Sequence, residues 1–428
     1  MNTTELYEHQ INALNVTKHR NRVAYYLDMG LGKTFVGAEK MHRLNEKVNL
    51  VVCQKSKIQD WIEHFTEYYY SDYLIFDLTN KNQYKYFFDD SIYSNKKSEL
   101  KIIGVINYEL AFRRLELKKL KDFTLMLDES SLIQNENAKR SKFILSLEAE
   151  NVILLSGTPT GGKYEKLWSQ MQLLGWNISK ALFWKQYVKY HIDKKQGFPI
   201  TIVDGYKNVD RLKEKMREYG CVFMKTEDVI SLPHQIHQHI KVDATKEYRK
   251  FRKNSIVLLP EKELVGDTAL TKMLYERQLC GQYNRDKLKA FRDLVESTND
   301  RLIVFYNFTA ELQTMIDTIR DLPLKVSVVN GEGTYLEYYE KYNDSITFIQ
   351  YQAGAMGLNL QKANKIVYFT PPLSSELFEQ SKKRIHRVGQ ERPCFYYYLT
   401  CRNSIEEKIY KRLEMRKDYT QKLFESED

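Results

Sequence analysis

The feature that most constrains this chain is a repeated alternation of short apolar segments with helical patterns. Five segments rich in β-branched residues occur in the first half of the sequence, and five more occur in the second half. Segments of this length, separated by helix-like stretches, are typical of buried strands in a parallel sheet covered by helices on both faces. Strands are expected at 23–27, 50–53, 102–106, 123–128 and 151–156, and then at 302–306, 325–329, 346–351, 365–369 and 395–399.

The chain has 428 residues, which is more than one compact domain usually holds. The strand pattern is interrupted around Pro233, so we predict two α/β lobes, residues 1–230 and 231–428. Segments 163–218 and 244–297 carry few strand signals and are expected to be mostly helical additions. The last stretch, 404–424, is predicted to be one long charged helix.

Charge and cysteine usage narrow the class of protein. The net charge is +10 and the pI is about 9.0, which favours a polyanionic partner such as nucleic acid. The five cysteines are scattered without a C-x-x-C pair, so neither a zinc ribbon nor a disulfide framework is indicated. No secretory signal and no apolar run of roughly 20 residues is seen. We therefore expect a cytoplasmic protein with no membrane partner.

A glycine-rich segment, LDMGLGKT at 27–34, follows the first predicted strand and precedes a helical pattern. This is where a phosphate-binding loop belongs, because Gly30 and Gly32 let backbone N–H groups approach phosphates. Lys33 would reach the β- and γ-phosphates, and the Thr34 hydroxyl would bind Mg²⁺. The segment opens with leucine where the strict pattern has glycine. The alternative is an ordinary glycine turn before a helix.

Two acidic residues, Asp128 and Glu129, end a later apolar strand. Acids at the carboxyl end of a buried strand suit hydrolysis: Asp128 would hold Mg²⁺ through water, and Glu129 would orient and deprotonate the attacking water. The alternative is two solvated acids at a strand end. The sequence SGTP at 156–159 follows the next strand and could sense the nucleotide, although a plain Gly-Pro turn would look the same.

Near the other end of the chain, Arg384 and Arg387 lie three residues apart within SKKRIHRVGQ (381–390). If this segment is helical, both guanidinium groups lie on one face and can reach a single anion. Arginine suits phosphate because it is always charged and binds in bidentate fashion. The alternative is a basic helix face in water.

The motif order GLGKT, DES, SGTP, GAMGLNL and RIHRVGQ resembles the superfamily 2 nucleic-acid motors, and specifically their Swi2/Snf2 branch of minimal bacterial or phage type. The resemblance implies two RecA-like lobes with modest helical insertions, and ATP and Mg²⁺ bound between them. It implies that Gln10 reads adenine, that Gln390 contacts the nucleotide, and that Arg384 and Arg387 act as arginine fingers on the γ-phosphate.

The resemblance also implies nucleic-acid contacts at eight positions: Lys55, Ser56, Asn107, Tyr108, Asn307, Gly354, Gly357 and Asn359. Some positions depart from the family pattern. The acidic motif reads DESS, which leaves its third and fourth positions without an assigned role. YQAG at 351–354 lacks a threonine and an arginine, and the tryptophan usual before the final motif is missing.

The function implied is a DNA-dependent ATPase that translocates on double-stranded DNA, in the cytoplasm of a bacterium or of a phage-infected cell. Two alternatives stay open. One is a helicase that separates strands, with single-stranded DNA or RNA as partner. The other is an ATP-gated clamp or adaptor for a replication or recombination protein. Glu129 and the two arginines argue for real turnover, because a pure switch could do without them.

Overall fold

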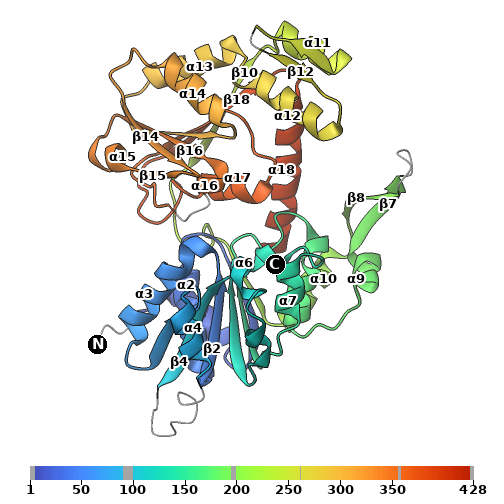
Figure 1. The fold of residues 1–428 in the computed structure, drawn as a ribbon, viewed down its shortest axis with the longest axis vertical. Coiled ribbons are helices and arrows are strands. Elements are labelled where there is room, and N and C mark those ends of the chain that lie inside the picture. The colour runs from blue at the N-terminus through green and yellow to red at the C-terminus, as the bar shows by residue number, and fades with distance from the viewer. Residues whose placement is uncertain (1–4, 90–99, 194–198, 261, 355–357, 425–428) are drawn as a thin grey trace. The chain divides into compact units, whose positions relative to one another are not determined.

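The computed structural model describes residues 5–89, 100–193, 199–260, 262–354 and 358–424. The chain divides into two compact units, one formed by residues 1–229 with 419–428 and the other by residues 230–418. Each unit contains its own seven-stranded sheet with helices packed on it (Figure 1). All ten strands predicted from the apolar segments are present, which confirms the α/β class and the two RecA-like lobes.

The sheet of the first unit is entirely parallel, in the order β3-β4-β2-β5-β6-β1-β9. Its strands are β1 (Arg22–Leu27), β2 (Val48–Cys53), β3 (Tyr73–Asp77), β4 (Lys101–Asn107), β5 (Phe123–Asp128), β6 (Asn151–Leu155) and β9 (Cys221–Met224). The described helices are α1 (Glu8–Val16), α2 (Lys33–Leu44), α3 (Ile58–Tyr69), α4 (Lys81–Phe87), α6 (Tyr108–Ala111), α7 (Lys139–Leu145), α8 (Trp168–Leu173), α9 (Lys180–Tyr187) and α10 (Val209–Glu218).

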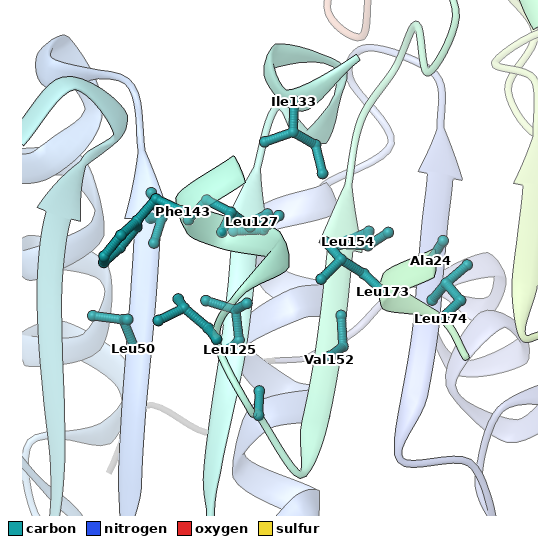
Figure 2. Close-up of a cluster of buried hydrophobic side chains, with 14 of the residues drawn as sticks. Ala24, Leu50, Leu125, Leu127, Ile133, Phe143, Val152, Leu154, Leu173 and Leu174 are labelled. Atoms are coloured by element: carbon teal, nitrogen blue, oxygen red, sulfur yellow. The ribbon is translucent and has the colours of Figure 1, made fainter. Parts of the chain in front are cut away.

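Alternate residues of the central strands face opposite layers, as the period of two requires. Figure 2 shows one face, where Leu125, Leu127 and Leu154 belong to one buried cluster with Phe143 of α7. Helix α2 covers the other face. A Cβ added to Gly37 of that helix would lie only 2.7 Å from a Leu155 methyl carbon. The sheet is therefore buried on both sides, which explains its near-continuous apolar strands.

The expectation of a mostly helical segment at 163–218 is wrong in part. After α9 the chain forms an antiparallel hairpin of β7 (Val188–Asp193) and β8 (Ile200–Tyr206). Most of the described hairpin residues are exposed or half-buried. A two-stranded ribbon with both faces exposed to solvent does not require a run of apolar residues, so its sequence carries only a weak strand pattern.

The second unit has the strand order β10-β18-β17-β13-β16-β14-β15, parallel except for the terminal β14–β15 pair. The strands are β10 (Gln235–Val242), β13 (Leu302–Tyr306), β14 (Lys325–Asn330), β15 (Gly333–Tyr335), β16 (Ser345–Gln350), β17 (Lys365–Tyr368) and β18 (Cys394–Cys401). The described helices are α11 (Lys246–Asn254), α12 (Ala269–Cys280), α13 (Arg285–Glu296), α14 (Thr309–Thr318), α15 (Glu337–Lys341), α16 (Tyr351–Gly354), α17 (Ser375–Lys382) and α18 (Ile405–Phe424).

This second sheet is also covered on both faces. Ile303 and Phe305 belong to one cluster, which contains Tyr410 of α18. The alternate residues Leu302 and Val304 belong to another cluster, with side chains of α13 and α14. Helices α11 and α12 pack on a small antiparallel pair, β11 (Ile256–Leu258) and β12 (Glu263–Val265), so the addition at 244–297 is mainly helical with one short ribbon (Figure 1).

Candidate nucleotide site and nucleic-acid contacts

The glycine-rich loop connects β1 to α2, as predicted from its position after the first apolar segment. Gly30 and Gly32 have φ angles of 89° and 73°, the left-handed region that glycine adopts most readily. Gly32 is the N-cap of the twelve-residue helix α2. The first backbone N–H groups of a helix have no intrahelical acceptors, and together with the helix dipole they favour an anion. The loop therefore has the geometry of a phosphate cradle.

The loop is fixed from beneath by a residue far along the chain. The Thr226 hydroxyl lies 3.0 Å from Asp28 Oδ2 and 3.1 Å from the Met29 carbonyl. The other carboxylate oxygen of Asp28 accepts the Met29 N–H at 2.8 Å. Thr226 follows β9, the strand next to β1. No short sequence pattern links this threonine to the loop, because the two are about 200 residues apart in the chain.

Lys33 lies within the loop, close to two other motif segments. Its Nζ donates to the Leu27 carbonyl at 3.1 Å. A Cβ added to Gly157, in SGTP, would lie 3.2 Å from the same Nζ, so glycine leaves room for the lysine. Burial raises the pKa of the Asp128 carboxyl, and the positive charge of Lys33 opposes this rise. The structure thus brings the GKT, DES and SGTP motifs together at the carboxyl edge of one sheet.

Asp128 is held by an indole that the sequence reading missed. Trp61 of α3 donates Nε1–H to Asp128 Oδ2 at 3.0 Å. Burial raises the pKa of the Asp128 carboxyl, while the Trp61 hydrogen bond and the charges of Lys33 and Lys57 lower it. Trp61 is 2% exposed and stacks on Phe65 at 5.8 Å between ring centroids. The carboxylate therefore has a fixed orientation, as a metal ligand needs.

Glu129 has a strained backbone, with φ 52° and ψ 59°. A non-glycine residue in this region costs free energy and is found most often where a site depends on the geometry. The Ser156 hydroxyl, in SGTP, donates to Glu129 Oε2 at 3.3 Å. Asp128 and Glu129 consequently leave β5 in different directions, each with its own hydrogen-bond donor.

The two serines of DESS now have a structural setting. Ser130 donates to Gln170 Oε1 at 2.8 Å, and the Tyr26 hydroxyl of β1 donates to the same oxygen at 2.9 Å. Gln170 Nε2 in turn donates to the Pro159 carbonyl at 2.8 Å. Gln170 and both serines, Ser130 and Ser131, are fully buried. One buried glutamine on α8 thus connects the DESS segment, β1 and the SGTP segment behind the site. No sequence motif predicted this role.

Gln10 lies directly against the glycine-rich loop. Its Nε2 donates to the Leu31 carbonyl at 3.2 Å, and its Oε1 accepts the Tyr7 N–H at 3.0 Å. A Cβ added to Gly32 would lie 2.2 Å from Gln10 Nε2. This position beside the phosphate loop is compatible with the predicted contact to a nucleotide.

The predicted nucleic-acid contacts of the first unit differ in exposure. Lys55 and Ser56 are exposed in a 3₁₀ turn, Lys55–Lys57, that leads directly into α3. Asn107 is nearly buried, and its amide donates to Glu109 at 3.1 Å. Tyr108 is the least exposed of these four residues. Its side chain is 1% exposed, and its hydroxyl donates to the Asp128 carbonyl at 2.9 Å. Tyr108 supports the acidic strand end from inside the core.

In the second unit, Asn307 follows β13 and belongs to a buried polar network. Its amide nitrogen lies 2.8 Å from Thr370 Oγ1 and 3.1 Å from the Pro371 carbonyl. Glu311 accepts the Asn307 backbone N–H at 2.9 Å. Arg277 of α12 donates to the same Pro371 carbonyl at 3.1 Å. These hydrogen bonds hold the Asn307 side chain in one orientation.

The GAMGLNL motif is only partly described. Gly354 is buried, and a Cβ there would lie 2.9 Å from an Ile349 side-chain carbon, so its glycine serves close packing. Asn359 is exposed, as a contact to nucleic acid requires. Gly357 lies outside the described residues.

The expected helix face at Arg384 and Arg387 is wrong. Helix α17 ends at Lys382, and residues 383–389 form turns, with Gly389 at φ 89°. The Tyr396 hydroxyl donates to the Lys382 carbonyl at 3.1 Å and so satisfies one of the last helical acceptors. Both arginines nevertheless belong to one short loop. Arg384 is 5% exposed, and burial lowers the pKa of the half-buried Arg387 guanidinium.

Gln390 closes this loop through its own side chain. Its Nε2 lies 2.8 Å from the Ala363 carbonyl and 3.2 Å from the Ile385 carbonyl, and its Oε1 accepts the Arg392 N–H at 3.0 Å. His386 Nε2 lies 2.9 Å from the Pro233 carbonyl. These bonds hold the arginine loop in shape through Gln390, and the predicted contact of Gln390 with the nucleotide stays a prediction.

The fold and the two sets of motif residues define a two-lobed, helicase-like nucleotide-binding protein. Family models match most of the chain: the SNF2-related domain over residues 9–288 and the helicase conserved C-terminal domain over residues 286–389. The chain belongs to the SNF2-related family, which confirms the family predicted from its motifs. Among the helices that the structure describes, none is long and apolar enough to cross a membrane.

Similar proteins come from several organisms. The mouse SWI/SNF-related matrix-associated actin-dependent regulator of chromatin subfamily A member 1 is 23% identical over 96% of this chain and 42% of its own length. The chromatin-remodeling complex ATPase ISW1 of Saccharomyces cerevisiae is 23% identical over 95% of the chain and 39% of its own length. The chain therefore spans about two fifths of these relatives. A Sulfolobus solfataricus SWI2/SNF2 ATPase core in complex with dsDNA has a TM-score of 0.44 and 20% identity, covering 98% of this chain and 93% of that one.

Proposed function

We propose that this protein is a DNA-dependent ATPase that uses ATP hydrolysis to translocate on double-stranded DNA. Lys33 and the N-terminus of α2 bind the phosphates, and Glu129 orients the attacking water and takes its proton. Thr34 and Asp128 are the residues that would hold Mg²⁺, which when bound neutralises charge on the phosphates. Both supply oxygen donors, the ligand type that Mg²⁺ prefers, and the Trp61 bond fixes one of them.

Arg384 and Arg387 complete the proposed chemistry as arginine fingers on the γ-phosphate. A guanidinium that approaches the transferred phosphoryl group stabilises charge in the transition state, and such a group is worth about 10³–10⁵ in rate. Burial of the loop lowers the local dielectric and strengthens this interaction. Gln390 and Gly389 hold the loop in the shape that presents both arginines.

The observation that carries the proposal is a continuous path from an exposed basic turn to the acidic site. Lys55 and Ser56 lie in the turn that begins α3, and Trp61 lies one helical turn into α3 with its indole N–H on Asp128. The charge of Lys57, in the same turn, acts on the Asp128 carboxyl. A phosphodiester bound at the turn would therefore act on the Mg²⁺ ligand through one rigid helix. This is the coupling that a DNA-stimulated ATPase needs.

The test is ATP hydrolysis by the purified chain with no nucleic acid, with duplex DNA, with single-stranded DNA and with RNA. Strong stimulation by duplex DNA, followed by displacement of a triplex-forming strand, is expected. Stimulation only by single strands or RNA would replace the translocase with the strand-separating alternative. Binding of ATP and DNA without turnover would favour the clamp or adaptor. The Glu129→Gln variant is the control, because it removes the proposed base and leaves the phosphate loop intact.

A further inference from the structure

A second basic site lies in the second unit, apart from the motif loops. A cavity of about 520 Å³ is lined by Asp243, Ala244, Tyr248, Arg249, Arg252, Lys253, Arg402 and Asn403. Four of these side chains are cations and one is a carboxylate, which gives the cavity a net charge of three positive. None of the family motifs contains these residues. The proposed translocase mechanism leaves them unused.

The cavity has a rigid wall. Tyr248 and Phe251 of α11 are buried in a cluster with Leu279, Cys280 and Cys401. The Tyr248 hydroxyl also accepts the Ile405 N–H at 2.8 Å, which ties α11 to the start of α18. Figure 1 shows α11 and α12 beside each other in this unit. The arginines of α11 therefore project from a helix that is fixed on its inner face.

Backbone carbonyls orient two of the guanidinium groups. Arg252 Nη1 donates to the Asn403 carbonyl at 2.7 Å, and Arg249 Nη2 donates to the Ala244 carbonyl at 2.9 Å. A guanidinium has five N–H donors, so each arginine keeps donors for a ligand. Arg402 contacts Asp243 at 3.1 Å in an exposed pair, which contributes little to stability. The single carboxylate of the cavity does not balance its four cations, and this excess of positive charge suits an anionic ligand.

The position of the cavity favours a long anion. Asp243 directly follows β10 and Arg402 directly follows β18, while Asn307 directly follows β13. These strands are parallel members of one sheet, so all three residues lie at the same edge. Two or three strand spacings separate them, about 10–15 Å at 4.7–4.9 Å per strand. One turn of duplex DNA spans about 34 Å, so one duplex can reach both places.

We propose that this cavity binds the phosphodiester backbone of double-stranded DNA, as an accessory contact beside the motif loops. The proposal rests on the proposed function in taking DNA as the ligand. Arg249 and Arg252 are three residues apart on α11 and lie on one face, so they can bind neighbouring phosphates. Contacts of this kind are independent of base sequence and sensitive to salt. The site increases the affinity of the protein for duplex DNA and takes no part in ATP hydrolysis.

The test compares Arg249→Gln/Arg252→Gln with a matched control, Lys246→Gln/Lys250→Gln. The control removes two exposed cations from the same helix, but neither residue lines the cavity. Binding of a 40-base-pair duplex is measured by fluorescence anisotropy between 50 and 200 mM salt. The binding constant K falls as the salt concentration rises, and each lost phosphate contact makes the slope of log K against log salt shallower by about 0.9. The slope of the arginine variant is expected to be shallower by about two units. Its loss of affinity relative to wild type should therefore be roughly tenfold smaller at 200 mM salt than at 50 mM salt.

Further arms separate the outcomes. The variant Arg249→Lys/Arg252→Lys keeps both charges, so its slope should return to that of wild type; failure to do so would mean a structural effect and overturn the site. Equal slopes in the arginine variant and the lysine control would also overturn it. ATPase activity at saturating duplex should be unchanged in all variants. If the wild type bound no duplex, the proposed function would fail as well. Binding of poly-glutamate in place of duplex would reassign the cavity to an acidic protein.

Discussion

Removal of the indole N–H of Trp61 tests the link between the turn proposed to contact DNA and the proposed nucleotide site. In Trp61→Phe the aromatic packing is mostly kept, while Asp128 loses a hydrogen bond of 3.0 Å. A hydrogen bond to a charged group contributes about 1.5–3 kcal/mol. Because Asp128 is only partly buried, water replaces some of that energy, and we expect the lower end of this range. At about 1.4 kcal/mol per factor of ten, the Mg²⁺ concentration for half-maximal turnover should rise about tenfold.

The pH dependence of the same variant has a defined sign. In the proposed site Mg²⁺ would bind the ionised Asp128 carboxylate, so activity should fall as the pH drops through the pKa of this group. The Trp61 hydrogen bond lowers that pKa against the effect of burial. Without the bond the pKa rises, and the acid limb of the pH profile should move to higher pH in Trp61→Phe.

Trp168→Phe is the matched control for this experiment. It removes an indole N–H that donates to the Ile178 carbonyl at 2.8 Å in the same unit. Both variants lose the same atoms from a tryptophan, so both should unfold at a lower temperature than wild type. Only Trp61→Phe should change the Mg²⁺ dependence and the acid limb. If the two variants shared one Mg²⁺ profile, Trp61 would have a packing role and the coupling path would be refuted.

Three further outcomes are expected. Glu129→Gln should still bind a fluorescent ATP analogue but lose turnover, and retained hydrolysis would remove Glu129 from the role of base. Arg387→Ala should lower kcat far more than nucleotide affinity, by about 10³ or more; a defect in DNA binding alone would contradict the finger role. Burial lowers the pKa of His64 to about 4, so the unfolded chain takes up a proton that the folded chain does not. The free energy of unfolding should therefore fall between about pH 7 and 5, by less in His64→Gln, as urea denaturation would show.

The parts of the fold that could be predicted are those whose residues are buried on both sides. Apolar runs such as 123–128 mark such strands without any tertiary knowledge, because few other structures need them. The missed strands consist mainly of exposed or half-buried residues. Strand β10, at one edge of its sheet, is mostly exposed along Gln235–Val242, and β7 and β8 form a wet hairpin. Many of their residues face solvent and need not be apolar, so these strands lack the apolar run that marks a buried strand.

The candidate site divides in a similar way. The positions of Lys33 and Asp128 could be predicted because each belongs to a local pattern, a loop before a helix or an acid at the end of a strand. Trp61, Thr226 and Gln170 could not, because each acts on a partner 40 or more residues away in the chain. Such contacts are decided by packing, which leaves no short motif. The same reason explains why the burial of Tyr108 could not be predicted, since a tyrosine in this segment looks alike in sequence whether it is buried or exposed.

Each unit carries a buried polar network directly behind its motif loops, and stability alone does not explain these networks. Glu311 and Arg277 are buried, which raises the pKa of the carboxyl and lowers that of the guanidinium. Buried charges and amides stabilise a fold no better than apolar side chains of similar volume. Their advantage is that hydrogen bonds fix the orientation of the segments that they connect. Gln170 joins Ser130 to Pro159, and the Glu311 network joins Asn307 to the segment after β17. For the proposed ATPase, whose loops would have to meet phosphates with high precision, such fixed orientation matters more than additional stability.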